Sequence, residues 1–197
     1  MTPHHFSLPP SPWVKRFAPL VPAGGEVLDL ACGAGRHAVL LAGLGYLVEA
    51  VDRDVSALAT LDAGGLIRPH VADLEGGVWP YTGRRFAGIV VTNYLYRPRL
   101  DALLAVLDTP GILIYETFMR GNEAYGKPAN PHFLLSSQEL LDWARRHALT
   151  VLAFEEGYVD LPKPAMVQRL CAIRGSLTAA LSSGIDDSAR QRVDACR

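Results

Sequence analysis

A glycine-containing segment, Val27-Leu-Asp-Leu-Ala-Cys-Gly-Ala-Gly-Arg-His-Ala38, carries the clearest chemical signal in the chain. Its pattern predicts a buried strand, a tight turn through Gly33 and Gly35, and the start of a helix. Glycine lets the backbone turn sharply and approach a ligand closely. Unpaired N–H groups at a helix start favour a carboxylate or a phosphate. Gly33-x-Gly35-x-x-Ala38 also satisfies a loose dinucleotide fingerprint, so the glycines alone leave the ligand open.

Three aspartates at the ends of three successive predicted strands narrow the choice of ligand. Asp29 lies at the end of the first strand, where a phosphate gains nothing from a negative charge but a cationic amine does. Asp52 follows the second strand and can accept hydrogen bonds from ribose hydroxyls, while Asp73 follows the third and can accept from an adenine amino group. Each acid alone could instead cap a helix or a turn. Together they fit a ligand with an amine, a ribose and an adenine, and without a phosphate.

Strands and helices must alternate to bring these residues together. Alternating patterns from residue 26 to residue 115 predict parallel strands with crossover helices on both faces. The last two strands have no helix between them and should pair antiparallel. We therefore expect an α/β fold with a doubly wound, mainly parallel, seven-stranded Rossmann-like sheet and an antiparallel edge strand. The expected strands are Glu26–Ala31, Leu47–Val51, Ile67–Ala72, Phe86–Val91, Ile112–Tyr115, Val151–Phe154 and Met166–Ile173.

Capping residues predict where several helices begin. Ser11-Pro12 should open the first helix, with Ser11 as the N-cap, and Asp54 should cap the helix after the second strand. Ser136-x-x-Glu139 matches a capping box and should start a helix that runs through His147. Residues 119–135 are rich in Gly, Asn and Pro, which suits either a partly ordered lid or packing over the sheet edge.

The overall composition limits the class of protein. The 197 residues fit a single domain, with a core over about 11–174 and a flexible tail over 175–197. A net charge of −1 gives no general attraction to nucleic acid or acidic membranes. No apolar run reaches about 18 residues, so no membrane span is expected. Cys32, Cys171 and Cys196 lack zinc-ligand spacing, and we expect a cytoplasmic protein without a metal. The oligomeric state leaves no signal.

The glycine segment resembles motif I of the class I S-adenosylmethionine-dependent methyltransferases, where Asp-x-Gly-x-Gly-x-Gly is usual. Here Asp29-x-Ala31-x-Gly33-x-Gly35 has alanine in place of the first glycine. Val51-Asp52 and Ala72-Asp73-Leu74 are similar to the second and third motifs. The resemblance covers about residues 11–174. The Cys-Gly-x-Gly-Arg stretch is similar to small bacterial members such as the tellurite-resistance methyltransferases.

The resemblance implies that S-adenosylmethionine is the cofactor and assigns parts of it to particular residues. The loop from Ala31 through Cys32 and Gly33 to Gly35 would hold the methionine part. Asp52, followed by Arg53, would hold the ribose. Asp73 and the backbone of Leu74 would hold the adenine. Asn93, after the fourth strand, would face both the methionine part and the acceptor.

The catalytic residues are less clearly marked. Asn93 and Tyr96 have the Asn-x-x-Tyr spacing of amino-group methyltransferases but lack the prolines between, so a nucleic-acid acceptor is not expected and a small molecule is. Tyr94 or Tyr96 could contact a sulfonium through a cation–π interaction. Glu116 could act as a base, orient the acceptor, or pair with an arginine. Two alternatives remain open at this point: an NAD-dependent oxidoreductase, and a non-catalytic module that binds S-adenosylmethionine.

Overall fold

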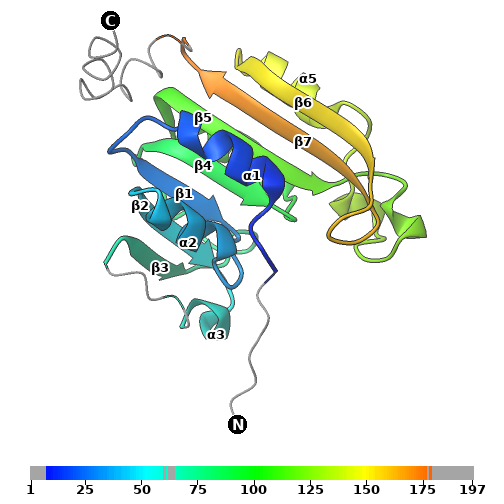
Figure 1. The fold of residues 1–197 in the computed structure, drawn as a ribbon, viewed down its shortest axis with the longest axis horizontal. Helices are drawn as coiled ribbons and strands as arrows, with labels where there is room; N and C mark the ends of the chain where they lie inside the picture. The colour runs from blue at the N-terminus through cyan, green and yellow to red at the C-terminus, as the bar shows by residue number, and fades with distance from the viewer. Residues whose placement is uncertain (1–7, 60, 62–64, 177, 179–197) are drawn as a thin grey trace, which may run out of the picture.

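The computed structural model describes residues 8–59, 61, 65–176 and 178, and its central feature is one seven-stranded sheet (Figure 1). The strand order is β3-β2-β1-β4-β5-β7-β6. The strands are β1 Glu26–Leu30, β2 Leu47–Asp52, β3 Ile67–Val71, β4 Phe86–Thr92, β5 Leu107–Phe118, β6 Thr150–Val159 and β7 Ala165–Arg174.

Strand direction follows the sequence prediction. Strands β1 to β5 pair in parallel, and β7 pairs antiparallel with both β5 and β6. The mainly parallel sheet and the antiparallel pair at one edge are therefore confirmed, with β7 lying one strand in from the edge and β6 outermost. The chain moves outward from β1 to β3 and then returns to β4 on the other side of β1. This reversal leaves a crevice beyond the carboxyl ends of β1 and β4.

Strand β5 is longer than the predicted Ile112–Tyr115. Pro110-Gly111 lies inside it rather than in a turn before it, and the pairing with β4 shifts register between Phe86 and Gly88. Beyond Tyr115 the strand continues because β7 supplies partners, such as Arg169 for Glu116. Partners that distant in sequence leave no local pattern.

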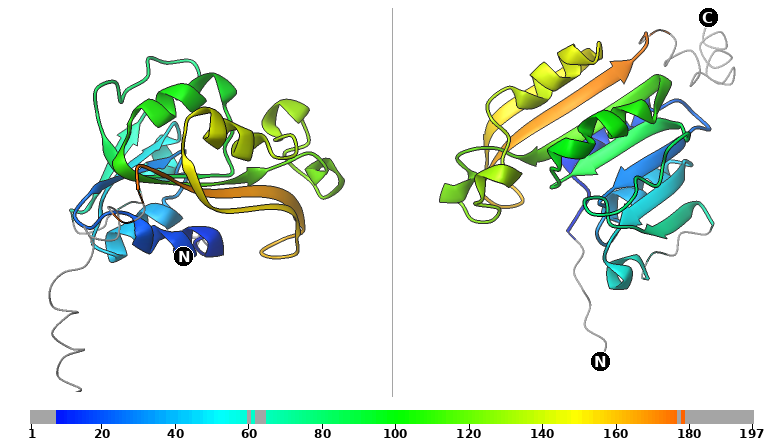
Figure 2. Two further views of the ribbon diagram at one scale, coloured as in Figure 1. Left: turned by 90° about the horizontal axis from the view of Figure 1, so that it is seen from above. Right: turned by 180° about the vertical axis from the view of Figure 1, so that it is seen from behind.

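Helices cover both faces of the sheet (Figure 2). Helices α1 Pro12–Phe17 and α2 Arg36–Gly43 lie on one face, whereas α4 Leu100–Ala105 and α5 Glu139–Arg146 lie on the other. The short α3 Val55–Leu58 packs its buried Leu58 into the same apolar cluster as α1 and α2. Four 3₁₀ turns complete the described elements: Ala18–Leu20, Arg97–Arg99, Asn122–Ala124 and Pro131–Phe133.

The first helix begins as predicted, but the last begins two residues later than the capping box predicts. Ser11 caps α1 by accepting from the Trp13 N–H at 3.1 Å. Helix α5 starts at Glu139 with Gln138 as its N-cap, so the prediction of Ser136 as the N-cap is wrong. Glu156 of β6 accepts hydrogen bonds from the Ser137 hydroxyl and the Gln138 N–H, at 2.6 and 2.7 Å. Half of the predicted capping box is nevertheless present, because the Ser136 N–H donates to Glu139 Oε2 at 2.8 Å.

Two further expectations concern the ends and surroundings of the chain. Within the described ranges, no helix combines the length and apolar character that crossing a membrane requires. The expected flexible tail over 175–197 falls mostly on residues 177 and 179–197, which lie outside the described part.

Candidate functional site

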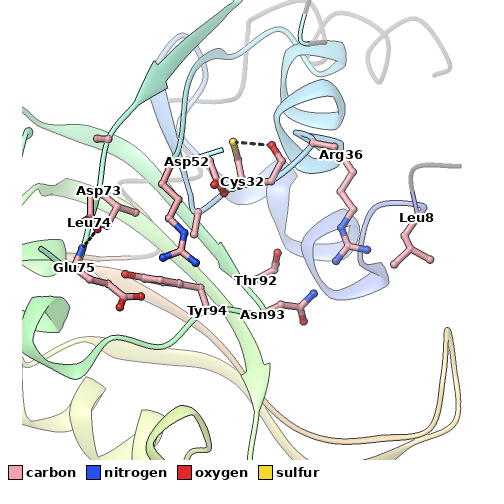
Figure 3. Close-up of a pocket in the computed structure, with 15 residues that line it drawn as sticks. Leu8, Cys32, Arg36, Asp52, Asp73, Leu74, Glu75, Thr92, Asn93 and Tyr94 are labelled. Carbon is pink, nitrogen blue, oxygen red and sulfur yellow. Dashed lines mark hydrogen bonds between the residues drawn. The ribbon is translucent and has the colours of Figure 1, made fainter. Parts of the chain in front are cut away.

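A cavity of about 580 Å³ opens where the strand order reverses, beyond the carboxyl ends of β1 to β4 (Figure 3). Its walls contain residues predicted to bind the cofactor from all four strand ends. These are Ala31, Cys32, Gly33, Asp52, Arg53, Asp73, Leu74 and Asn93. The sequence thus located most of this cavity, because the residues follow directly after strands whose order the fold rules constrain.

The loop after β1 owes its shape to alternate residues in the left-handed region. Ala31, Gly33 and Gly35 have φ values of 54°, 55° and 70°. An alanine in this region costs about 1–2 kcal/mol, since its Cβ approaches the carbonyl oxygen. Ala31 nevertheless adopts the backbone shape that glycine has in the motif that this segment resembles. Gly35 lies outside the cavity lining; a Cβ there would collide with Leu61. Its contribution is the turn itself.

Asp52 ties this loop to the second strand. Its Oδ2 accepts from the Gly33 N–H at 2.8 Å, and its Oδ1 accepts from the Asp54 N–H at 3.0 Å. Asp54 in turn caps α3, as predicted, by accepting from the N–H groups of Ser56 and Ala57. The Gly33 amide therefore already binds a carboxylate, where a dinucleotide fold would present it to a phosphate. This arrangement disfavours a pyrophosphate ligand.

Acidic side chains outnumber basic ones around the cavity. Asp52, Asp73 and Glu75 face Arg36 and Arg53, so the formal charge of the lining is −1. The N–H groups of Glu75 and Gly76 hold the pKa of Asp73 below its ordinary value, which keeps that carboxylate ionised. The sequence prediction did not include Glu75, because it lies directly after the third motif, Ala72-Asp73-Leu74, rather than within it.

Asp29 lies behind the loop rather than on the cavity surface. It is 1% exposed, and neither carboxylate oxygen has a hydrogen-bond partner among the described residues. Burial raises its pKa to about 7. Direct contact with a ligand amine, as expected from the sequence, is not part of this geometry.

The segment after β4 brings Asn93 and Tyr94 to the cavity, but not Tyr96. Asn93 has φ of 55° and donates its N–H to the Glu116 carbonyl at 2.9 Å. Tyr94 extends toward Glu75 (Figure 3), and its buried hydroxyl has no partner among the described residues. Tyr96 donates its hydroxyl to the Glu75 carbonyl at 3.2 Å and lines neither cavity. The left-handed turn at Asn93 therefore favours Tyr94 over Tyr96 as the aromatic residue of the site.

A second cavity of about 780 Å³ adjoins the first. It lies between the segment Leu8–Pro12, the end of β5 and the connection from β6 to β7. Leu8, Arg36 and Asn93 line both cavities, so the two share a boundary. None of residues 119–135 lines either cavity, so in this structure that loop does not cover the site.

Glu116 lines the second cavity, but its carboxylate is already engaged. Its Oε2 accepts from Arg169 Nε at 2.7 Å and from the Ser11 hydroxyl at 3.0 Å. Of the three roles that the sequence left open for Glu116, the structure favours the ion pair with an arginine. A general base must be free to take a proton, so this arrangement argues against Glu116 in that role.

His37 anchors the N-terminal segment, a contact that the sequence did not indicate. Its Nε2 accepts from the Ser11 N–H at 3.0 Å, so the ring proton lies on Nδ1, which donates to Thr92 Oγ1 at 3.3 Å. Burial lowers the pKa of His37 to about 3, and the ring stays neutral. Arg36 adds a second anchor by donating to the Pro9 carbonyl at 3.0 Å.

Two other chemistries find little support here. Burial raises the pKa of the Cys32 thiol, which is only 8% exposed, so it stays protonated and unreactive. Across the part of the chain that the structure describes, no three His, Cys, Asp or Glu side chains gather as a metal-binding group.

Comparisons with known proteins agree with this geometry. The family model for "Tellurite resistance protein TehB" matches residues 14–67, which include β1, the glycine loop and β2. No curated protein sequence matches the chain. The match covers the part of the chain that supplies Asp52 and the loop after β1.

Solved structures share the fold over most of the chain. TehB from Haemophilus influenzae has a TM-score of 0.65 at 19% identity, over 82% of this chain and 61% of TehB, so the chain spans less than two thirds of that protein. The glycopeptide N-methyltransferase MtfA complexed with sinefungin gives 0.60 at 17% identity, over 88% and 90% of the two chains. The 1,6-didemethyltoxoflavin-N1-methyltransferase of Burkholderia thailandensis, with bound 1,6-didemethyltoxoflavin and S-adenosylhomocysteine, gives 0.59 at 17%, over 85% and 80%.

At these identities the likeness shows the fold. The chain has the Rossmann-like fold of the class I S-adenosylmethionine-dependent methyltransferases, and its N-terminal third is similar to TehB. The resemblance predicted from the sequence is confirmed.

Proposed function

We propose that this protein is an S-adenosylmethionine-dependent methyltransferase that acts on a small molecule. The observation that carries the proposal is the pair of adjoining cavities that meet at Asn93. The first has the acidic strand ends and glycine loop that suit the cofactor. The second provides a separate space for an acceptor beside it.

The residues present fit the cofactor. S-adenosylmethionine carries a sulfonium and an ammonium, and the first cavity has a formal charge of −1. The Tyr94 hydroxyl is buried without a hydrogen-bond partner among the described residues, as expected of a group whose partner is a ligand. The Tyr94 ring can also contact a sulfonium through its face. An NAD cofactor fits less well, because Asp52 occupies the Gly33 amide.

The proposed contacts follow the motif residues on the cavity wall. The loop Ala31–Gly33 would hold the methionine part, with Asn93 opposite. Asp52 and Arg53 would hold the ribose, while Asp73 and the backbone of Leu74 would hold the adenine. When bound, the cofactor supplies an activated methyl group: an acceptor lone pair bonds to the methyl carbon as the carbon–sulfur bond breaks, and that electron pair stays on sulfur.

The chain's own contribution is to position the acceptor and exclude water. The segment Leu8–Pro12 forms one wall of the second cavity and is fixed by His37 and Glu116. With Glu116 held by Arg169, the described lining offers no free carboxylate in the second cavity. We therefore propose that an acceptor proton, where one must leave, passes to solvent.

The proposal extends to the acceptor's size and the protein's setting. A cavity of about 780 Å³ lies in the range of small-molecule sites. Cys32 and Cys171 are free and buried, which suits a reducing cytoplasm. We also propose that residues 11–174 act as a single domain, since both apolar clusters pack on the same sheet.

Calorimetry with S-adenosylhomocysteine and with NAD tests the cofactor. We expect S-adenosylhomocysteine to bind and NAD to give no signal; NAD binding alone would contradict the proposal. Transfer of a tritiated methyl group from S-adenosylmethionine should then be measured over a panel of small amines, phenols, thiols and carboxylic acids. Cofactor binding without transfer to any class would favour a non-catalytic cofactor-binding module.

A further inference from the structure

The two adjoining cavities differ in charge. The first is lined by three acidic and two basic side chains. The second is lined by Lys15, Arg36, Lys163 and Arg169 against the single acid Glu116, a formal charge of +3. Arg36 stands at the shared boundary, so the positive potential extends up to the junction.

The positive charge of the second cavity is not fully neutralised by the protein. Arg169 is paired with Glu116 at 2.7 Å and lies 3.5 Å from Glu155. Lys15 and Lys163, by contrast, form no ion pair with any described residue. Two exposed lysines thus line a cavity in which no carboxylate is free to balance their charge.

The two lysines approach the cavity from different elements. Lys15 is on α1, and Lys163 is in the connection between β6 and β7. The β6–β7 hairpin curves toward the face of the sheet that carries α1 (Figure 2). A ligand between these elements would therefore meet a cation on either side.

The remaining walls are largely apolar. They combine proline, aliphatic and aromatic side chains from all three elements that form the cavity: Leu8, Pro9, Phe118, Val159, Leu161 and Val167. Such walls stabilise an apolar body by removing its surface from water, and they offer an inorganic ion few partners.

We propose that the methyl acceptor is an organic anion: an apolar ring or chain bearing a carboxylate or a sulfonate-like group. Lys15 and Lys163 bind the anionic group, and the apolar body lies against Phe118 and Val167. This inference rests on the proposed function, because it takes the second cavity as the acceptor site. The charge difference between the cavities also assigns each ligand to one of them, since a cationic cofactor favours the acidic cavity and an anionic acceptor favours the basic one.

Cationic acceptors are selected against by the same arrangement. An ammonium placed between Lys15 and Lys163 would meet like charges on both sides, and desolvating it would bring no compensating partner. The proposal therefore predicts a preference for acids over amines of the same size.

Two fluorescent probes with a shared apolar ring system test the charge requirement. 8-Anilinonaphthalene-1-sulfonate carries a sulfonate, and N-phenyl-1-naphthylamine is its neutral counterpart. Both are titrated into the full chain with S-adenosylhomocysteine in excess, so that the first cavity is occupied. We expect the sulfonate to bind more tightly than the neutral probe, with the difference shrinking at high salt.

Substitution of the lysines locates the effect. The double variant Lys15→Gln and Lys163→Gln should weaken sulfonate binding by about tenfold at low ionic strength and leave the neutral probe nearly unchanged. Lys127→Gln is the matched control, because Lys127 is exposed and lines neither cavity. Unchanged sulfonate binding in the double variant, or equal binding of both probes to the unaltered protein, would overturn the proposal.

Calorimetry with S-adenosylhomocysteine on the same variants separates the two proposals. We expect its affinity to be unaltered by the lysine substitutions. If S-adenosylhomocysteine binds but sulfonate binding does not depend on the lysines, only the proposal of an anionic acceptor is refuted. If sulfonate binding depends on the lysines but S-adenosylhomocysteine does not bind, the proposed function fails, and with it the assignment of this anion site to an acceptor.

Discussion

Replacing Asp29 by asparagine should stabilise the protein at neutral and alkaline pH. The carboxylate is 1% exposed and has no hydrogen-bond partner among the described residues, so its charged form is poorly accommodated. Asparagine has nearly the same shape and carries no charge, and it therefore imitates the protonated acid.

The size of the effect follows from the pKa of Asp29. Folding raises it from the ordinary value of 3.8 to about 7, chiefly because burial disfavours the charged form. At 1.36 kcal/mol per pKa unit, this corresponds to about 4 kcal/mol. The folded state holds the proton between these pH values and the unfolded state does not, so this contribution favours folding at low pH and is lost as pH rises to 7. Asp29→Asn should thus exceed the unaltered protein by up to about 4 kcal/mol at pH 8 and converge with it near pH 4.

Urea denaturation followed by tryptophan fluorescence measures this difference, because Trp13, Trp79 and Trp143 are all buried. His37 adds a dependence of opposite sign: burial lowers its pKa from 6.5 to about 3, so its contribution to stability is lost as pH falls below 6.5. Both proteins contain His37, and its effect cancels in the difference between them. A stability difference that does not vary between pH 4 and 8, or a less stable variant at pH 8, would refute the reasoning.

Two other substitution experiments probe the site. Asp52→Ala should weaken S-adenosylhomocysteine binding ten- to a hundredfold, since a charged acceptor contributes about 1.5–3 kcal/mol per hydrogen bond. Asp54→Ala should instead lower stability and leave the affinity measured by calorimetry nearly unchanged, because Asp54 caps α3. The reverse pattern would move the ribose contact to Asp54. Glu116→Gln should lower the free energy of unfolding by about 1–3 kcal/mol, because Arg169, with a side chain only 16% exposed, loses its charged partner. In an Arg169→Met background the same change should cost less, and equal costs in denaturant titrations would show that the pair is not coupled.

The first cavity could be predicted from the sequence because its chemistry is local. Asp52 and Asp73 directly follow predicted strands, and the rules for parallel sheets place the carboxyl ends of neighbouring strands together. The glycine turn indicated which ends would face a ligand. The same local rule did not reveal that Asp52 would bind the Gly33 amide, because that contact depends on how β1 and β2 are offset.

The second cavity could not be predicted, because its parts are far apart in the sequence. Ser11 and Glu116 are 105 positions apart, and Glu116 and Arg169 are 53 apart. The sequence also could not decide whether Tyr94 or Tyr96 contacts the first cavity. The answer depends on the left-handed backbone conformation of Asn93, which asparagine can adopt but does not require.

The contacts of Ser11 have a practical consequence for expressing shortened versions of the protein. By composition, the residues before the first helix look like a polar segment that could be removed. A truncation beginning at Pro12 would retain the apolar clusters on both faces of the sheet. It would nevertheless remove the Ser11 N–H that donates to His37 and the Ser11 hydroxyl that donates to Glu116. It would also remove Leu8, which lines both cavities. Such a fragment could fold and still bind its ligands poorly, and its inactivity would then be mistaken for the loss of a catalytic residue.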